Sequence, residues 1–163
     1  MNTETRTYDY DTRPFDPATA LAIPGIDYIR GIIRGDFPAP PITATLGFTI
    51  VEVDSGHAIF EGTPGRFVYN PIGSVHGGYA ATLLDSAMGC AVHTTLPAGK
   101  AYTTVDLAVS YVRAITEKSG MIRAEAKVIH TGSSIVTAEG RVVGADGTLY
   151  AHGTTTCLVL TPR

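Results

Sequence analysis

The middle of the chain has the hydrophobic pattern of a buried helix. Of the 33 residues between Arg66 and Lys100, only Asp85 is formally charged. Apolar side chains recur there as neighbouring pairs with a period of four, which forms an apolar stripe on a helix. We expect Ser74 to cap this helix and the segment 96–99 to end it. The pairs are Tyr79-Ala80, Leu83-Leu84, Ala87-Met88 and Ala91-Val92.

Apolar runs on both sides of this helix predict strands. Two precede it, at residues 42–53 and 57–63, and four follow it, at residues 102–112, 121–130, 135–144 and 148–160. In the third predicted strand, Val105, Leu107, Val109 and Tyr111 fall on one face and Thr104, Asp106, Ala108 and Ser110 on the other. We therefore predict an α+β fold with one long central helix and a mostly antiparallel sheet of five to six strands around it.

The beginning of the chain has a different texture. Residues 1–16 show no periodicity, which predicts a loose arm. Residues 17–35 have the spacing of a short amphipathic helix, interrupted near Pro24 and Gly25. The prolines that follow favour an extended connector, because each fixes its own φ and restricts the preceding residue. We therefore expect an N-terminal arm with a short helix over residues 1–41 and a second domain over residues 42–163.

Composition narrows the classes of function. The chain has 163 residues, 44% hydrophobic and 17% charged, with a net charge of −3. The charged fraction is below the usual quarter, which suggests surface buried by self-association. Scattered Lys and Arg argue against nucleic-acid binding. The sequence shows no signal peptide and no membrane-spanning run, so we expect a cytoplasmic protein without membrane contact.

Two features carry candidate chemistry. Asp85 is a lone carboxylate in the middle of the predicted helix, where it is either functional or satisfied by a hydroxyl, a backbone N–H or solvent. The loop Asn70-Pro71-Ile72-Gly73-Ser74-Val75-His76-Gly77-Gly78 runs straight into that helix. Free N–H groups at a helix start, with glycines beside them, suit an oxyanion hole, although the glycines could instead serve tight packing. Neither Cys90 nor Cys157 has metal-ligand spacing, so we expect no metal.

The loop and the carboxylate lie far apart along the helix. Asp85 comes nine residues after His76, which is about 13 Å along the helix axis. The carboxylate of one chain is thus too far from its own Gly77 N–H for both to reach one carbonyl group. A two-fold dimer with antiparallel helices would bring Asp85 of one subunit near Gly77 of the other. The spacing therefore favours a site between subunits.

Together these residues resemble the hotdog-fold acyl-CoA thioesterases, and most closely the PaaI-like group (phenylacetate-pathway and 4-hydroxybenzoyl-CoA thioesterase type). The resemblance covers residues 42–160 and implies the hotdog fold, with an N-terminal helical extension that some members add. It also implies a homodimer or homotetramer that hydrolyses an acyl-CoA to the free acid and coenzyme A without a cofactor. It is carried by Leu46-Gly47-Phe48, Asn70, His76-Gly77-Gly78, Asp85, Thr103-Thr104-Val105-Asp106-Leu107 and Tyr111-Val112-Arg113.

The resemblance also implies a role for each matched residue. Gly77 would donate its backbone N–H to the thioester carbonyl, and Asp85 of the partner subunit would be the nucleophile or the general base. Asn70 would orient water or the thioester, His76 would hold the loop, and Thr104 would assist the water or the acid. The residues expected to bind substrate or to shape its pocket are Gly78, Thr103, Tyr79, Leu83, Met88, Arg113, Ser133 and Ser134.

Two other functions stay open. A hotdog enoyl-CoA hydratase would use an Asp and a His on one loop, and the loop acid is missing here. A non-catalytic acyl-CoA-binding module would bind the thioester and release no thiol. The identity of the acyl group is not readable from the sequence, and a medium-chain or arylacetyl group is suggested only by analogy. The extension over residues 17–41 is hypothesised to act as a lid.

Overall fold

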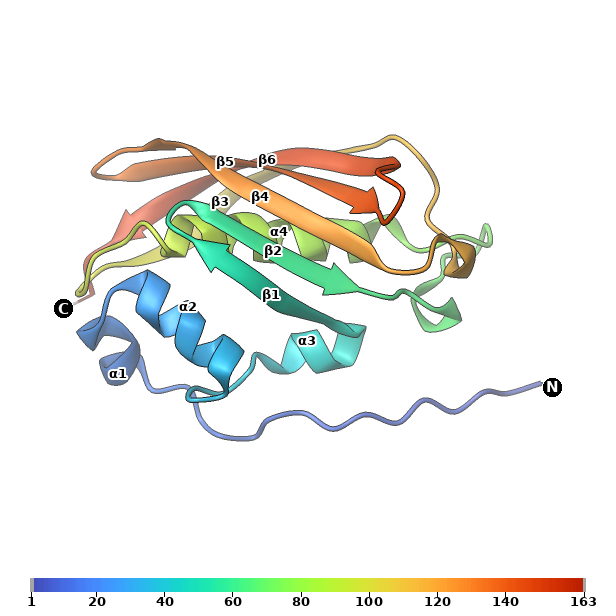
Figure 1. Cartoon of the computed structure of the whole chain (residues 1–163), viewed down its shortest axis with the longest axis horizontal. Helices are drawn as coiled ribbons and strands as arrows, with labels where there is room; N and C mark the ends of the chain where they lie inside the picture. Colours follow the sequence, from blue (N-terminus) through green and yellow to red (C-terminus); the bar gives the residue numbers. More distant parts are fainter. Residues whose placement is uncertain (1, 163) are drawn as a thin grey trace.

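The computed structural model describes residues 2–162 as a six-stranded sheet curled around one long helix (Figure 1). The strand order is β1-β2-β4-β5-β6-β3 with every pair antiparallel, which leaves β1 and β3 at the two edges. This arrangement confirms the predicted hotdog fold. The elements are α4 (Gly77–His93), β1 (Phe48–Asp54), β2 (His57–Gly62), β3 (Ala101–Tyr111), β4 (Ile122–Thr131), β5 (Ile135–Gly144) and β6 (Leu149–Leu160), with short 3-10 helices at Arg66–Val68 and Glu117–Ser119.

The predicted apolar stripe of α4 forms the centre of the core. All four residue pairs of the stripe are buried against the concave face of the sheet. Each fully buried Leu or Met side chain contributes roughly 1.5–3 kcal/mol relative to an exposed one. Gly140 on β5 lets the helix approach closely, because a Cβ there would lie 3.1 Å from both Leu84 and Met88. The helix is therefore closely packed against the sheet. None of the helices described in residues 2–162 is long and apolar enough to span a membrane.

The start of α4 differs from the prediction. The N-cap is His76, whose Nδ1 accepts a hydrogen bond from the Gly78 N–H at 2.9 Å. Ser74 is instead part of the preceding turn, where its backbone carbonyl accepts from the Asn70 N–H and its hydroxyl accepts from the Asn70 side chain. The predicted Ser74 cap is thus wrong, because this turn already engages Ser74.

The segment predicted as the beginning of the first strand is helical. Residues Pro41–Leu46 form α3, and the strand starts only at Phe48. Proline is well suited to the first helical position, since its φ is already helical and its missing N–H would have no partner there. Gly47 ends α3 with a φ of 72°, a left-handed conformation that favours glycine. Apolar periodicity alone did not distinguish this short helix from a strand.

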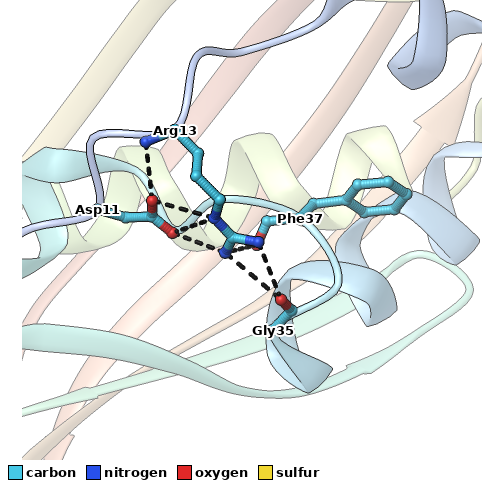
Figure 2. A network of polar contacts seen from close by, with 4 residues as sticks. All are labelled: Asp11, Arg13, Gly35 and Phe37. Carbon is cyan, nitrogen blue, oxygen red and sulfur yellow. Dashed lines mark hydrogen bonds and ion pairs between the residues drawn. The ribbon is translucent and has the colours of Figure 1, made fainter.

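The N-terminal extension forms two helices and an arm that is held in place. Helices α1 (Pro17–Ala22) and α2 (Gly25–Arg34) are separated near Pro24 as predicted, and α2 packs on β1 and α4. The arm lacks secondary structure but is not loose throughout. Figure 2 shows the Arg13 guanidinium bound to the Asp11 carboxylate at 2.7 Å and to the carbonyl groups of Gly35 and Phe37. Arg6 donates to two carbonyl groups at the end of α3.

A β-bulge changes which side chains of β3 face the helix. The register with β6 shifts between Thr104 and Asp106, so an additional residue interrupts the alternation. Val105 is 56% exposed, which contradicts its predicted place beside Leu107 and Val109. Those two residues pack against the core, and Thr104 lies on the same inner side. Because of the bulge, the Thr104 hydroxyl faces the helix, whereas strict alternation along β3 would place Thr104 on the face opposite to Leu107.

Candidate active site

The loop before α4 is organised by Asn70. Its Oδ1 accepts hydrogen bonds from the N–H groups of Ile72 and Ser74, both at 3.1 Å, and its Nδ2 donates to the Ser74 hydroxyl at 3.0 Å. Gly73 adopts a φ of 84° within this turn, which favours glycine. The loop is tied to the body because the Val75 N–H donates to the carbonyl of Ile115. One Asn70 side-chain N–H is left for a ligand, whereas the Oδ1 is fully engaged.

The first turn of α4 leaves a backbone donor at Gly77. The neighbouring N–H groups are used, since Gly78 donates to the His76 ring and Tyr79 donates to the His76 carbonyl. Nothing within residues 2–162 accepts a hydrogen bond from the Gly77 N–H. N–H groups in the first turn carry a partial positive charge. Gly77 thus offers a fixed, unpartnered donor where a developing negative charge would be stabilised.

A pocket of about 340 Å³ opens at this donor. The Tyr111 ring covers one side of Gly77, because a Cβ at Gly77 would lie 3.0 Å from it. Arg113 is exposed on the wall of the pocket, where its backbone N–H donates to the carbonyl of Tyr150. The other lining residues are Asn70, Ser74, Val75, His76, Ala80, Val112, Ala114, Ile115 and Tyr150. The pocket therefore joins a hydrogen-bond donor, an aromatic wall and a cationic side chain.

Asp85 lies on α4 beyond this pocket and is held by β3. The Thr104 hydroxyl donates to Asp85 Oδ1 at 3.1 Å, and no other hydrogen bond to the carboxylate is found within residues 2–162. Asp85 belongs to none of the ion pairs formed by these residues. The carboxylate is half-buried, so it stays accessible. It therefore has one oriented oxygen and one oxygen free for water or substrate.

Three titratable side chains whose pKa values are influenced by the charge of Asp85 titrate above neutral pH. Burial, assisted by the negative charge of Asp85, raises the pKa of the Cys90 thiol to about 12. Burial also raises the pKa of Tyr102 and of Cys157. These groups stay protonated near neutral pH, so they act neither as nucleophiles nor as bases there. Residues 2–162 contain no cluster of three His, Cys, Asp or Glu side chains that could hold a metal ion.

The predicted site residues fall into separate groups in one chain. Asp85 comes eight residues after Gly77, or about 12 Å along α4, so the two do not meet within a subunit. Asp85 lies on the stripe of α4 that the sheet leaves partly uncovered, together with Thr82 and Ser86. Ser133 and Ser134 are at the hairpin between β4 and β5, near the other end of the helix from the pocket (Figure 1). Within one chain the predicted site residues therefore lie in separate places.

Several residues predicted to bind substrate have other surroundings. Leu83 and Met88 are fully buried in the core, and neither lines the pocket at Gly77. Tyr79 is 3% exposed, and its buried hydroxyl has no hydrogen-bond partner within residues 2–162. Thr103 is exposed, since alternation turns it away from the inner face that Thr104 occupies. A Cβ at Gly78 would approach the His76 ring at 2.9 Å, so this glycine serves the local cap.

The sequence and the fold match known proteins. A family model described as the thioesterase superfamily matches residues 72–151. A solved structure from Ralstonia eutropha, a phenylacetic acid degradation-related protein to which a thioesterase function is ascribed, is 30% identical with a TM-score of 0.73. That match covers 80% of this chain and 98% of the other. The chain belongs to the thioesterase superfamily. Membership confirms the predicted family and supports the predicted enzyme class, a hydrolase.

Two relatives of this thioesterase-superfamily chain match it over shorter segments. A protein of Halobacterium salinarum to which an esterase function is ascribed is 44% identical over 84 residues, covering 50% of this chain and 54% of the relative. The 1,4-dihydroxy-2-naphthoyl-CoA hydrolase of Listeria monocytogenes is 24% identical over 90 residues, covering 55% of this chain and 72% of the relative. The chain thus spans about half the length of the halobacterial relative.

Sequence reasoning missed two residues beside the candidate groups. Tyr111 was expected on a strand face, and its ring instead covers Gly77 at the pocket. Cys157 was taken only as a non-ligand thiol, and its Sγ lies 3.9 Å from Thr104 Oγ1. An aromatic residue just before Val112-Arg113 could have suggested the first contact. Nothing in the sequence signals the second, because it depends on the pairing register of β3 and β6.

Proposed function

We propose that this protein is an acyl-CoA thioesterase whose active site forms between two subunits. The observation that carries the proposal is the unpartnered Gly77 N–H at the mouth of a pocket, on the same helix as the accessible Asp85 carboxylate. Gly77 of one subunit would bind the thioester carbonyl oxygen. Asp85 of the partner subunit would supply the attack on the carbonyl carbon.

The donor at Gly77 would stabilise the negative charge that forms on the carbonyl oxygen. A thioester carbonyl is already activated, so one fixed donor and a positioned attacking group suffice without a metal. The His76 cap supports this role, because it takes up the Gly78 N–H and keeps the first turn in place. Loss of one such donor typically lowers the rate by about 10²–10³.

Asp85 would act in one of two balanced ways. As a base, it takes a proton from water; the resulting hydroxide adds to the carbonyl carbon, the C–S bond breaks, and the coenzyme A thiolate takes up the proton. As a nucleophile, it forms a mixed anhydride with the acyl group and expels the thiolate, and water then hydrolyses the anhydride. In both cases the Thr104 hydroxyl would orient the carboxylate through Oδ1.

Association of two chains is supported by three features. Gly77 and Asp85 are separated by about 12 Å on one helix, so a single chain does not complete the site. The stripe of α4 that carries Asp85 is left partly uncovered by the sheet. β3 is an edge strand with eleven residues, and its Val105 and Tyr111 side chains are more than half exposed. Long edge strands with apolar side chains tend to pair with another chain.

The substrate class is inferred from the superfamily and from Arg113. The name of the Listeria relative specifies an aromatic acyl-CoA, and the Ralstonia protein is related to degradation of phenylacetic acid. An aromatic or arylacetyl thioester is therefore our first choice of substrate. Arg113 lines the pocket and would bind the phosphates of coenzyme A. Ser133 and Ser134 would contact the nucleotide of coenzyme A only if that coenzyme A is bound at the Gly77 pocket of the partner subunit.

Thiol release from a panel of acyl-CoAs tests this proposal. Benzoyl-, phenylacetyl-, hexanoyl- and palmitoyl-CoA would be incubated with the wild type, with Asp85→Asn and with Asp106→Asn as the matched control. Asp106 is an exposed acid on the same strand as Thr104. We expect Asp85→Asn to reduce thiol release by at least about 10³ while Asp106→Asn stays near wild type. Binding without thiol release would favour the non-catalytic module, and loss of enoyl absorbance with crotonyl-CoA would favour the hydratase.

A further inference from the structure

Behind the pair formed by Asp85 and Thr104 lies a third side chain that the proposed chemistry does not use. Cys157 on β6 is paired directly opposite Thr104 on β3, and its Sγ lies 3.9 Å from Thr104 Oγ1. Cys157 is fully buried in the hydrophobic core, whereas Asp85 keeps part of its surface accessible. Thr104 therefore connects a thiol in the core to a carboxylate at the uncovered stripe of α4.

The direction of these two hydrogen bonds follows from counting protons. A threonine hydroxyl has one proton and two lone pairs, and an ionised carboxylate only accepts. Thr104 donates its proton to Asp85 Oδ1 at 3.1 Å, so it has none left for sulfur. The Cys157 thiol must then be the donor in the second contact. Burial raises the pKa of this thiol, so its proton is retained.

We propose that Cys157 is a positioning residue, whose thiol donates to Thr104 Oγ1 and thereby holds the Thr104 hydroxyl proton on Asp85. A hydroxyl hydrogen rotates to suit its neighbours, and a donor on its other side removes the orientations that point there. The bulge between Thr104 and Asp106 fixes the strand at this point. The buried Thr155 braces the bulge by donating to the Asp106 carbonyl at 2.7 Å. The effect on catalysis rests on the proposed function of Asp85.

Cys90 offers a matched control for this role. It is a second, partly buried thiol, and desolvation together with the negative charge of Asp85 raises its pKa to about 12. Unlike Cys157, its thiol makes no hydrogen bond to any group within residues 2–162. Cys90 is only partly buried and Cys157 is fully buried, so the stability of each variant is compared along with its kcat. Only removal of Cys157 should change the orientation of Thr104.

A kinetic double-mutant cycle tests the inference. With the acyl-CoA that the wild type hydrolyses fastest, we expect Cys157→Ala to lower kcat about two- to tenfold with KM unchanged. We expect no change in kcat for Cys90→Ala. In a Thr104→Val background, Cys157→Ala should cause no further loss, because its effect passes through the Thr104 hydroxyl. Cys157→Val, which fills the space, repeats the test, and the thermal midpoint of every variant checks that it is folded.

The infrared S–H stretching band tests the contact without any activity. Cys157→Ala and Cys90→Ala assign the two thiol bands, and Thr104→Val should then shift the Cys157 band while leaving the Cys90 band in place. An unmoved Cys157 band, or a kcat loss in Cys157→Ala that persists in the Thr104→Val background, would overturn the inference. A wild type that releases no thiol would instead contradict the proposed function, and the infrared result would still decide the contact.

Discussion

The two halves of the candidate site are built in different ways. At the donor end, residues 69–77, nearly every contact that shapes the backbone joins residues close in sequence, from the Asn70 turn to the His76 cap. At the acid end, formed by Asp85, Thr104 and Cys157, the contacts join three separate elements. The donor end is therefore set by local turn chemistry and the acid end by sheet register. The donor end should be sensitive to substitutions close to it in sequence, and the acid end to substitutions far from Asp85 in sequence.

Replacement of Gly77 by proline should cause the largest change at the donor end. Proline removes the N–H but is well accepted at the first position of a helix, and the preceding His76 has a compatible backbone (φ −60°, ψ 135°). We expect kcat to fall by about 10²–10³. Gly77→Ala is the control, since it adds the same Cβ beside Tyr111 and keeps the N–H. Equal losses in both variants would assign the effect to crowding rather than to the donor.

Replacement of Asn70 by alanine should disturb the loop that holds the donor. The change removes three hydrogen bonds within the 70–74 turn. We expect the free energy of unfolding to fall by about 2 kcal/mol, with a loss of activity because the Gly77 N–H is displaced. Ser74→Ala, which removes only the hydroxyl contact, should cost about 1 kcal/mol in the same urea titration. An Asn70→Ala protein of wild-type stability would show that the turn does not depend on this side chain.

Replacement of Thr104 by valine should act on the acid end. Valine keeps the branched shape but lacks the hydroxyl that donates to Asp85. We expect kcat to fall about tenfold with little change in KM, as for the loss of one orienting hydrogen bond to a charged group. Thr103→Val is the matched control on the exposed side of the same strand and should leave kcat unchanged. Similar losses at both positions would mean that β3 as a whole, not the hydroxyl, matters.

The difference between local contacts and contacts between separate elements also explains which features the sequence could predict. The apolar stripe of α4, the strand count and the loop leading into the helix follow from periodicity and turn residues, which are local signals. The helix cap was assigned to Ser74 because the competing hydrogen bonds from Asn70 are visible only once the turn is folded. The helix α3 was taken for a strand because its run between proline and glycine is too short to show a period.

The acid end was less accessible to sequence reasoning. Asp85 stood out because it was the lone charge in an apolar helix, and Thr104 was assigned by resemblance to a family. Simple alternation placed Thr104 on the face opposite to Leu107, and the bulge in β3 brings both to the inner side. Such a bulge has no signature in this strand's sequence. The assignment of Leu83 and Met88 to the substrate pocket stays a prediction, and in this chain both side chains are fully buried in the core.

Mixed oligomers test the central claim, a site shared between subunits, most directly. Gly77→Pro and Asp85→Asn subunits, each nearly inactive alone, would be unfolded, mixed in equal amounts and refolded together, and thiol release would be measured. In a mixed dimer, one site contains both defects and the other site is intact. Random pairing makes about half of the dimers mixed, so about a quarter of wild-type activity should return. Mixtures that stay as inactive as the separate variants, although mixed dimers have formed, would contradict a site between subunits.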